Sequence, residues 1–352
     1  HRLIRRQRQM CIRDRFIIFT SIFIAEFSFY ICLRYLMKEQ HINIKNSLYL
    51  NIAGVVGGTV YAVNPFALGR LWSYAFYPGY ALLPLIFMFS LIYFREDFKF
   101  KYAFILSLLI FLAMTTPILI IYIIAFFISI GLLAFFLDNH RIVLRKLILV
   151  IKKIYIILVI TVLFSAFWLL PMSYIFMEEG GVVHPMVESI ENNVNWLSKS
   201  CDLINIVRLV GGSRFLIDPT LVGEENVDVV KEQTALSYRG VTNPNDVKDF
   251  LWKICSFIIP IMAFSSFLFI HPLKHKDNNF LNKVTIYLAL IFVFGVLLSK
   301  GTSEPFGDLY IILFFKTPMM NCFAPLFRNS SKFQFFVSFP VCLLYAISIA
   351  KI

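Results

Sequence analysis

The segment KGTSEPFGDLYIILFFKTPMMNCFAPLFRNSSKF, residues 300–333, lies between two strongly apolar runs. Two acids stand near its start, Glu304 and Asp308, and two bases stand near its finish, Arg328 and Lys332. Its three prolines are typical of non-helical backbone that lines a cavity at membrane depth. We therefore expect a re-entrant segment at a membrane surface. It is the first candidate site for an anionic, membrane-borne substrate.

The composition of the whole chain indicates a membrane protein. Of its 352 residues, 59% are hydrophobic and 39 are phenylalanine, which exceeds what a soluble domain carries. Several runs approach or exceed the ~20 apolar residues that a helix needs to cross a bilayer. These runs predict an all-α, polytopic integral membrane protein with eight or nine spans. The predicted helices cover 16–36, 47–63, 81–94, 102–114, 118–137, 154–176, 250–270 and 284–298, and a last one begins near Phe335.

The segment NPFALGRLWSYAFYPGY, residues 64–80, interrupts this series of helices. It is aromatic, contains two prolines and carries one charge, Arg70. This pattern predicts an interfacial or re-entrant segment, with Trp72 and Tyr77 at the level of the lipid headgroups. Asn64 stands directly before a proline, so we interpret it as the end of the preceding helix.

The formal net charge of +12 is uneven along the chain. Residues 1–15, HRLIRRQRQMCIRDR, supply +5 of it and leave +7 for the rest. This string resembles a translated sequencing adapter, so we expect residues 1–15 to be either non-native or a basic cytoplasmic tail. The other basic residues gather in short loops, most clearly in 138–153, as the positive-inside rule predicts. We therefore expect no nucleic-acid partner.

Placing 138–153 in the cytosol orients the rest of the chain. It puts 64–80 and 300–333 outside the cytosol, together with 177–249, the one long polar region. The predicted parts are an N-terminal transmembrane bundle (16–176), an extracytoplasmic lobe (177–249) and a C-terminal transmembrane bundle (250–352) that contains 300–333.

Three stretches resemble a known family: NPFALGRLWSYAFYPGYALLPLIF (64–87), KGTSEPFGDLY (300–310) and APLFRNSSKF (324–333). They are similar to the multi-spanning GT-C glycosyltransferases, in the branch of the large arabinofuranosyltransferases and YfhO-like membrane proteins. The resemblance implies a GT-C-like helical bundle in a prokaryotic cell membrane. It also implies transfer of a sugar from a polyprenyl-phosphate carrier to an external glycan, lipid or protein acceptor.

The resemblance further implies a general base, which in this family is usually an acid in the first external loop. By the topology above, that loop precedes Phe16. We therefore expect this sequence to be a fragment without the family's main catalytic acid, and the catalytic residues stay unknown.

Arg328 and Lys332 are the leading candidates for substrate binding. They are four residues apart, so on a helix both face one side. An Arg fork and a Lys point charge suit a lipid-linked phosphate or diphosphate. The alternative is a pair of interfacial bases that touch ordinary headgroups. The same two interpretations apply to Arg70, because a lone Arg among aromatic residues contacts either a carrier phosphate or the headgroups.

Glu304 and Asp308 are also four residues apart, between Lys300 and a short apolar helix predicted at 309–315. They are candidates to bind a divalent cation or an acceptor hydroxyl; the alternative is two acids that favour a helix start through its dipole. Cofactors otherwise stay unknown, because the six cysteines and six histidines form no metal-binding pattern. The acids Glu178 and Glu179 and the lone His184 read more simply as solvated residues.

Two other functions remain open from the sequence. A transporter or flippase for a lipid-linked intermediate would use the same external bases without a catalytic acid, and a non-catalytic scaffold would need neither. A transporter should carry polar or charged residues at mid-membrane depth. The predicted helices contain almost none, which favours an enzyme whose site lies at the surface.

Overall fold

The computed structural model describes the chain in thirteen stretches, which leave most of the predicted lobe 177–249 outside. Apart from Asn64, Glu96, Lys99, Met114 and Gly301, every described residue is helical, which agrees with the all-α prediction. The described residues are 2–38, 47–64, 66–67, 77–96, 99–114, 126–127, 129–131, 133, 143–178, 257–269, 279–301, 307–316 and 333–351.

Four of the described helices are long and apolar enough to cross a membrane, namely Phe16–Lys38, Tyr77–Arg95, Ile148–Phe167 and Phe280–Lys300. They support the prediction of a membrane protein. The named elements are α1 (Arg2–Lys38), α2 (Ser47–Val63), α4 (Tyr77–Arg95), α5 (Phe100–Ala113), α7 (Val143–Glu178), the 3₁₀-helix η3 (Ser266–Phe269), α12 (Asn279–Lys300), α13 (Gly307–Ile311), the π-helical turn η5 (Ile312–Lys316) and α16 (Phe335–Lys351).

Helix boundaries differ from the prediction mainly where the sequence is basic. The bounds of α2 agree with the predicted 47–63, but α1 begins at Arg2 and α7 at Val143, well before the apolar runs. Arg, Lys and Leu are good helix formers, so a helix continues through a basic stretch. Hydropathy therefore marks where a helix meets hydrocarbon and not where it begins. Of the predicted helix 118–137, only six residues are described, all of them helical.

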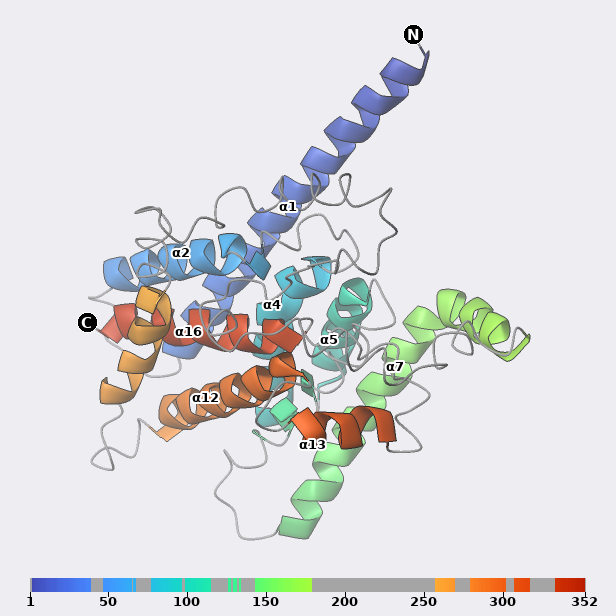
Figure 1. The fold of residues 1–352 in the computed structure, drawn as a ribbon. Coiled ribbons are helices and arrows are strands. Elements are labelled where there is room, and N and C mark those ends of the chain that lie inside the picture. The colour runs from blue at the N-terminus through green and yellow to red at the C-terminus, as the bar shows by residue number, and fades with distance from the viewer. Residues whose placement is uncertain are drawn as a thin grey trace.

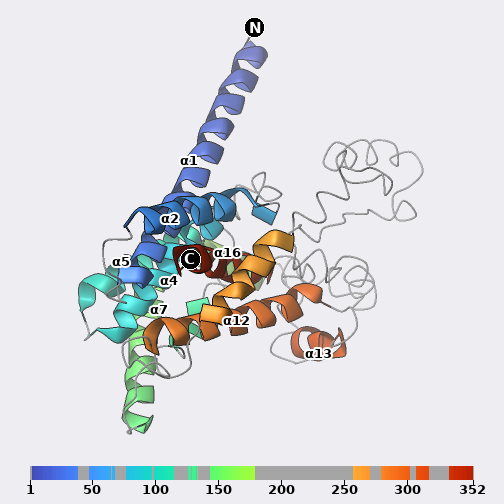
Figure 2. The ribbon, with the colours of Figure 1, turned by 90° about the vertical axis from the view of Figure 1, so that its left-hand side faces the viewer.

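Helix α16 lies at the centre of the arrangement. It packs between α2 and α12, while α1 lies against α2 and α4, and α5 connects α4 to α7 (Figure 1). The N-terminal part of α1 extends away from the other helices in both views (Figures 1 and 2). Helix α7 lies at the edge and bends in its last third, where Pro171 interrupts the backbone hydrogen bonds (Figure 1).

Aromatic rings fill the space around α16. Phe339 is fully buried, and its ring centroid lies 5.3 Å from that of Phe87 on α4 and 5.9 Å from that of Phe126. It also meets Tyr61 of α2 edge-on at 6.1 Å. Offset and edge-to-face contacts of this kind stabilise a core beyond the area that they bury. The rings therefore fix α16 against α2 and α4.

Helices α12 and α16 approach each other through Gly295. A Cβ atom built at this position would lie 2.8 Å from Cβ of Phe336 and 2.9 Å from its backbone carbon. Backbone atoms cannot move aside as a flexible side-chain end can. Small residues allow such close helix contacts in membranes, so Gly295 sets the spacing of this pair.

We expect Gly295→Ala to lower the stability of the protein, because overpacking of this kind costs roughly 1–3 kcal/mol. Thermal unfolding of the purified protein in detergent measures the change. Gly131→Ala is the matched control, since a Cβ there meets only side-chain atoms, the nearest being Cδ1 of Ile154 at 3.2 Å. Equal losses in the two variants would contradict the close approach of α12 and α16.

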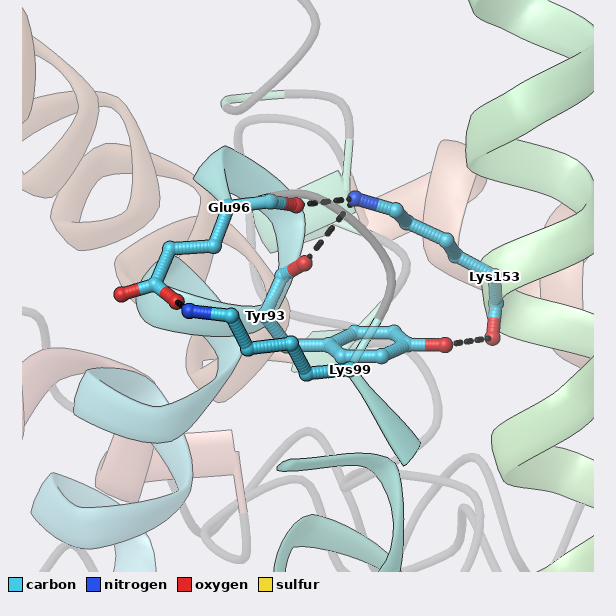
Figure 3. A network of polar contacts seen from close by, with 4 residues as sticks. All are labelled: Tyr93, Glu96, Lys99 and Lys153. Carbon is cyan, nitrogen blue, oxygen red and sulfur yellow. Dashed lines mark hydrogen bonds and ion pairs between the residues drawn. The ribbon is translucent and has the colours of Figure 1, made fainter. Parts of the chain in front are cut away.

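Lys153 joins α7 to the end of α4. Its ammonium group donates hydrogen bonds to the carbonyl oxygens of Tyr93 at 3.0 Å and Glu96 at 2.8 Å (Figure 3). It also donates to the carbonyl oxygen of Phe94 at 3.2 Å. In return, the Tyr93 hydroxyl donates to the Lys153 carbonyl at 3.3 Å. The last carbonyls of a helix have no partner within the helix and carry the negative end of its dipole. A cation on α7 therefore caps α4.

Replacing Lys153 by Met should destabilise the protein by about 1–3 kcal/mol, because three carbonyls lose a charged donor. Lys152→Met removes the same charge from an exposed neighbour on α7 and should have little effect. The readout is the denaturant midpoint of each variant in detergent. If both variants unfold at the same midpoint, the capping role is wrong.

Candidate functional site

The structure describes one of the five predicted binding residues. Asp308 lies in the first turn of α13 and is exposed. Glu304, Arg70, Arg328 and Lys332 lie outside the described residues, as do Glu179 and His184, and Glu178 is the last residue of α7. The roles predicted for these side chains therefore stay predictions. What the structure supplies is the position of the chain on either side of them.

A group of aromatic rings holds α13 and η5 against the start of α16. The short helix predicted at 309–315 corresponds to these two elements. Tyr310 and Phe314 are buried, with ring centroids 4.7 Å apart, and Phe314 lies 5.9 Å from Phe333. Phe333 in turn lies 6.4 Å from Phe336 in α16. The described residues on either side of 317–332, the stretch that carries Arg328 and Lys332, therefore lie close together.

A second group is polar and buried, and we name it the Asn64 cluster: Tyr61, Asn64, Tyr77, Tyr80 and Ser338. The amide nitrogen of Asn64 lies 2.7 Å from the Tyr61 carbonyl, 2.9 Å from the Tyr80 hydroxyl and 3.1 Å from the Ser338 hydroxyl. The hydroxyls of Tyr80 and Ser338 also share a hydrogen bond at 2.9 Å. The cluster therefore connects the end of α2, the start of α4 and the first turn of α16.

Two tyrosines strengthen the connection between α2 and α4. The Tyr61 hydroxyl donates to the Tyr80 carbonyl at 2.5 Å, and the Tyr80 hydroxyl donates to the Tyr61 carbonyl at 2.7 Å, with the rings stacked at 4.3 Å. The Tyr77 hydroxyl donates to the Ala62 carbonyl at 2.8 Å. We expected Tyr77 at the lipid headgroups. The structure shows that Tyr77 begins α4 and is only 2% exposed, so its side chain packs within the protein, and its depth in a membrane stays a prediction.

The flanks of the two predicted phosphate-binding segments meet at the Asn64 cluster. Arg70 lies in 68–76, and the residues on both sides of that stretch belong to the cluster or hydrogen-bond to it. Lys332 directly precedes Phe333, and Ser338 follows within two helical turns. The described residues on both sides of 68–76 therefore touch this group of hydrogen bonds, and Phe333 lies five residues before one of its members.

Sequence reasoning missed most of the residues that make this connection. It identified Asn64 only as a helix end, although the Asn64 carboxamide also accepts a hydrogen bond from the Ala67 amide at 3.0 Å. Ser338 looked like an ordinary residue of an apolar helix, and Tyr80 like the last residue of the interfacial segment 64–80. The available signal was an amide beside a proline inside an apolar run, since buried polar groups need partners. This signal does not identify Ser338, the partner of Asn64, which lies 274 positions away in the sequence.

Within the part of the chain that the structure describes, no three His, Cys, Asp or Glu side chains come together as a metal site. The divalent cation predicted at Glu304 and Asp308 is not tested by this, because Glu304 lies outside that part.

Comparison of the chain with family models, with curated proteins and with solved structures gave no match.

The link between the two segments can be measured with a double-mutant cycle. We expect Asn64→Ala and Ser338→Ala to be coupled by about 0.5–3 kcal/mol in unfolding free energy, because each removes part of one hydrogen-bond network. A control cycle pairs Asn64→Ala with Ser107→Ala, whose hydroxyl bonds the Ile157 carbonyl between α5 and α7. Strict additivity in the first cycle would show that the cluster does not join α2 to α16.

Proposed function

We propose that the protein is a GT-C-type glycosyltransferase of a prokaryotic cell membrane, with eight or nine spans. It moves a sugar from a polyprenyl-phosphate carrier to an external glycan, lipid or protein acceptor. The extracytoplasmic side carries 64–80, 177–249 and 300–333. The observation that supports the proposal most is the Asn64 cluster, because it ties together the flanks of two segments that each carry predicted phosphate-binding bases.

The chemistry needs positive charge where the carrier phosphate lies. Transfer breaks the bond between the sugar C1 and the phosphate oxygen and forms a bond from C1 to the acceptor oxygen. Arg328, with its two-pronged donor, and Lys332 are proposed to hold the phosphate, and Arg70 to approach it from the other segment. A general base takes the acceptor proton, and no residue of this chain is assigned to that role.

Glu304 and Asp308 are proposed at the acceptor side of the same surface. Asp308 is exposed at the start of α13, on an element that the aromatic rings pin beside Phe333. Its carboxylate is available to an acceptor hydroxyl or to a divalent cation that bridges it to the carrier. The exposed apolar residues Leu309, Ile312 and Leu313 continue along this segment and suit contact with membrane lipids.

A second candidate is a transporter for a lipid-linked intermediate, and one observation favours it. Glu26 lies well inside the apolar span Phe16–Lys38 of α1. Charged side chains within membrane spans often belong to ion or substrate pathways. The two candidates separate in a vesicle assay: a transferase releases free polyprenyl phosphate from the donor, whereas a transporter moves the intact lipid-linked sugar between leaflets. A non-catalytic scaffold does neither.

We call Arg328 and Lys332 together the phosphate clamp. The clamp is tested by measuring how undecaprenyl phosphate binds to the protein in nanodiscs. We expect Arg328→Ala to weaken binding by about ten- to a hundredfold, because a charge-assisted hydrogen bond contributes roughly 1.5–3 kcal/mol. Lys332→Ala should weaken binding less. Sugar transfer should be abolished by Arg328→Ala, while membrane insertion and folding stay intact.

Lys101→Ala is the control for loss of one positive charge, since Lys101 is exposed at the start of α5, near the Lys153 cap of α4. It should leave carrier binding unchanged. Full binding and full transfer in Arg328→Ala would exclude the clamp. If Lys101→Ala weakens carrier binding as much as Arg328→Ala does, the effect of Arg328→Ala is one of net charge alone.

A further inference from the structure

Glu26 is an acidic side chain that neither the core nor the proposed transfer reaction uses. It lies ten residues after Phe16 and twelve before Lys38, the ends of the apolar span of α1. With a rise of 1.5 Å per residue, it is about 15 Å and 18 Å from those ends. Phe23 and Phe27 beside it are 65% and 52% exposed and stack on each other. Apolar side chains therefore flank Glu26 along α1.

Helix α2 is shaped to receive this side chain. Gly58 leaves room for it, because a Cβ there would lie 3.0 Å from the Glu26 carbonyl oxygen and 3.1 Å from its Cγ. Gly54, one turn away, does the same for Tyr30, whose ring would lie 2.5 Å from a Cβ. Two glycines at this spacing usually bring helix backbones together. Here they admit Glu26 and Tyr30 between the helices.

Hydrogen bonds complete the arrangement. The Thr59 hydroxyl donates to Oε1 of Glu26 at 3.0 Å, and the Tyr30 hydroxyl donates to Oδ1 of Asn51 at 2.8 Å. Among the described residues, Thr59 supplies the one hydrogen bond to the Glu26 carboxyl group, and no described cation pairs with it. The second carboxyl oxygen therefore has room for a further donor or for its own proton.

We propose that Glu26, seated on Gly58 and hydrogen-bonded by Thr59, is a proton-binding site within the membrane. A carboxylate is costly in hydrocarbon, and a bound proton removes that cost while the Thr59 hydrogen bond remains. Thr59 is four residues from the end of α2, about 6 Å along the helix. The buried Asn64 cluster lies at that end of α2. The inference does not depend on transferase activity.

Other titratable groups stand on the helices packed against α1, but no described hydrogen bond or ion pair joins any of them to Glu26. They are Tyr49 and Tyr61 of α2, Tyr77, Tyr80, Tyr93 and Arg95 of α4, and Cys342, Tyr345 and Lys351 of α16. Tyr61, Tyr80 and Cys342 are buried in the core, where Tyr61 stacks on Phe29. On α1 itself, the Tyr30 hydroxyl donates to Asn51, and Arg34 is eight residues further along.

A hydrophobic carbodiimide tests the proposal, because this reagent modifies protonated carboxyl groups in apolar surroundings. The acid proton passes to a reagent nitrogen, the carboxylate oxygen bonds to the central carbon, and the acyl group then migrates to nitrogen as a stable N-acylurea with nothing released. The full chain in lipid nanodiscs is treated with dicyclohexylcarbodiimide across a range of pH, and the adduct is mapped by mass spectrometry.

We expect the hydrophobic reagent to form an adduct on Glu26 at acidic pH, because the reaction consumes the acid proton. Glu26→Gln should lose the adduct, whereas Glu96→Gln, which removes an exposed acid paired with Lys99 at 2.7 Å, should keep it.

Two results would overturn the proposal. One is a Glu26 that stays unmodified by the hydrophobic reagent at acidic pH. The other is a Glu26 that a water-soluble carbodiimide modifies as fast as Glu96, which would make it an ordinary solvent-exposed acid. Both results come from the unaltered chain, so the test stands even where Glu26→Gln fails to fold.

Discussion

The hydrogen bonds between Asn64, Tyr80 and Ser338 are the constraint on which the arrangement depends. The chain breaks its helix after Val63, and Asn64 at the break is only 3% exposed. In such surroundings an unpaired backbone or amide group is costly. Side chains from α4 and α16 supply the missing partners. The break in α2 is therefore stable only while these three helices stay together.

This constraint explains why α16 is central. Ser338 places its first turn against α2 and α4, and Phe339 on the next position fills the aromatic core. The preceding residues, Phe333 and Phe336, carry the same packing outward to α13 and η5. The start of α16 thus makes both a polar contact and an aromatic contact.

The sequence predicted helices better than contacts. Hydropathy located α2 to the residue, because its limits coincide with polar residues on both sides. It did not predict the contact of Tyr77, whose hydroxyl donates to a carbonyl of the preceding helix. Partners such as Asn64 and Ser338 are far apart in sequence, so no local pattern joins them. Asp308 is described, but the four other predicted binding residues lie outside the described stretches.

Lys153 and Glu26 show how the same cost of a charge in a membrane helix leads to different roles. The Lys153 ammonium group has three carbonyl acceptors at a helix end, which match its three donors. Such a site is closed, so the charge has a structural task. Glu26 has a single hydroxyl donor for a group with two oxygens. Hydrogen bonding to Glu26 is thus incomplete within the described chain, which leaves room for the proposed proton, whereas Lys153 holds α4 and α7 together.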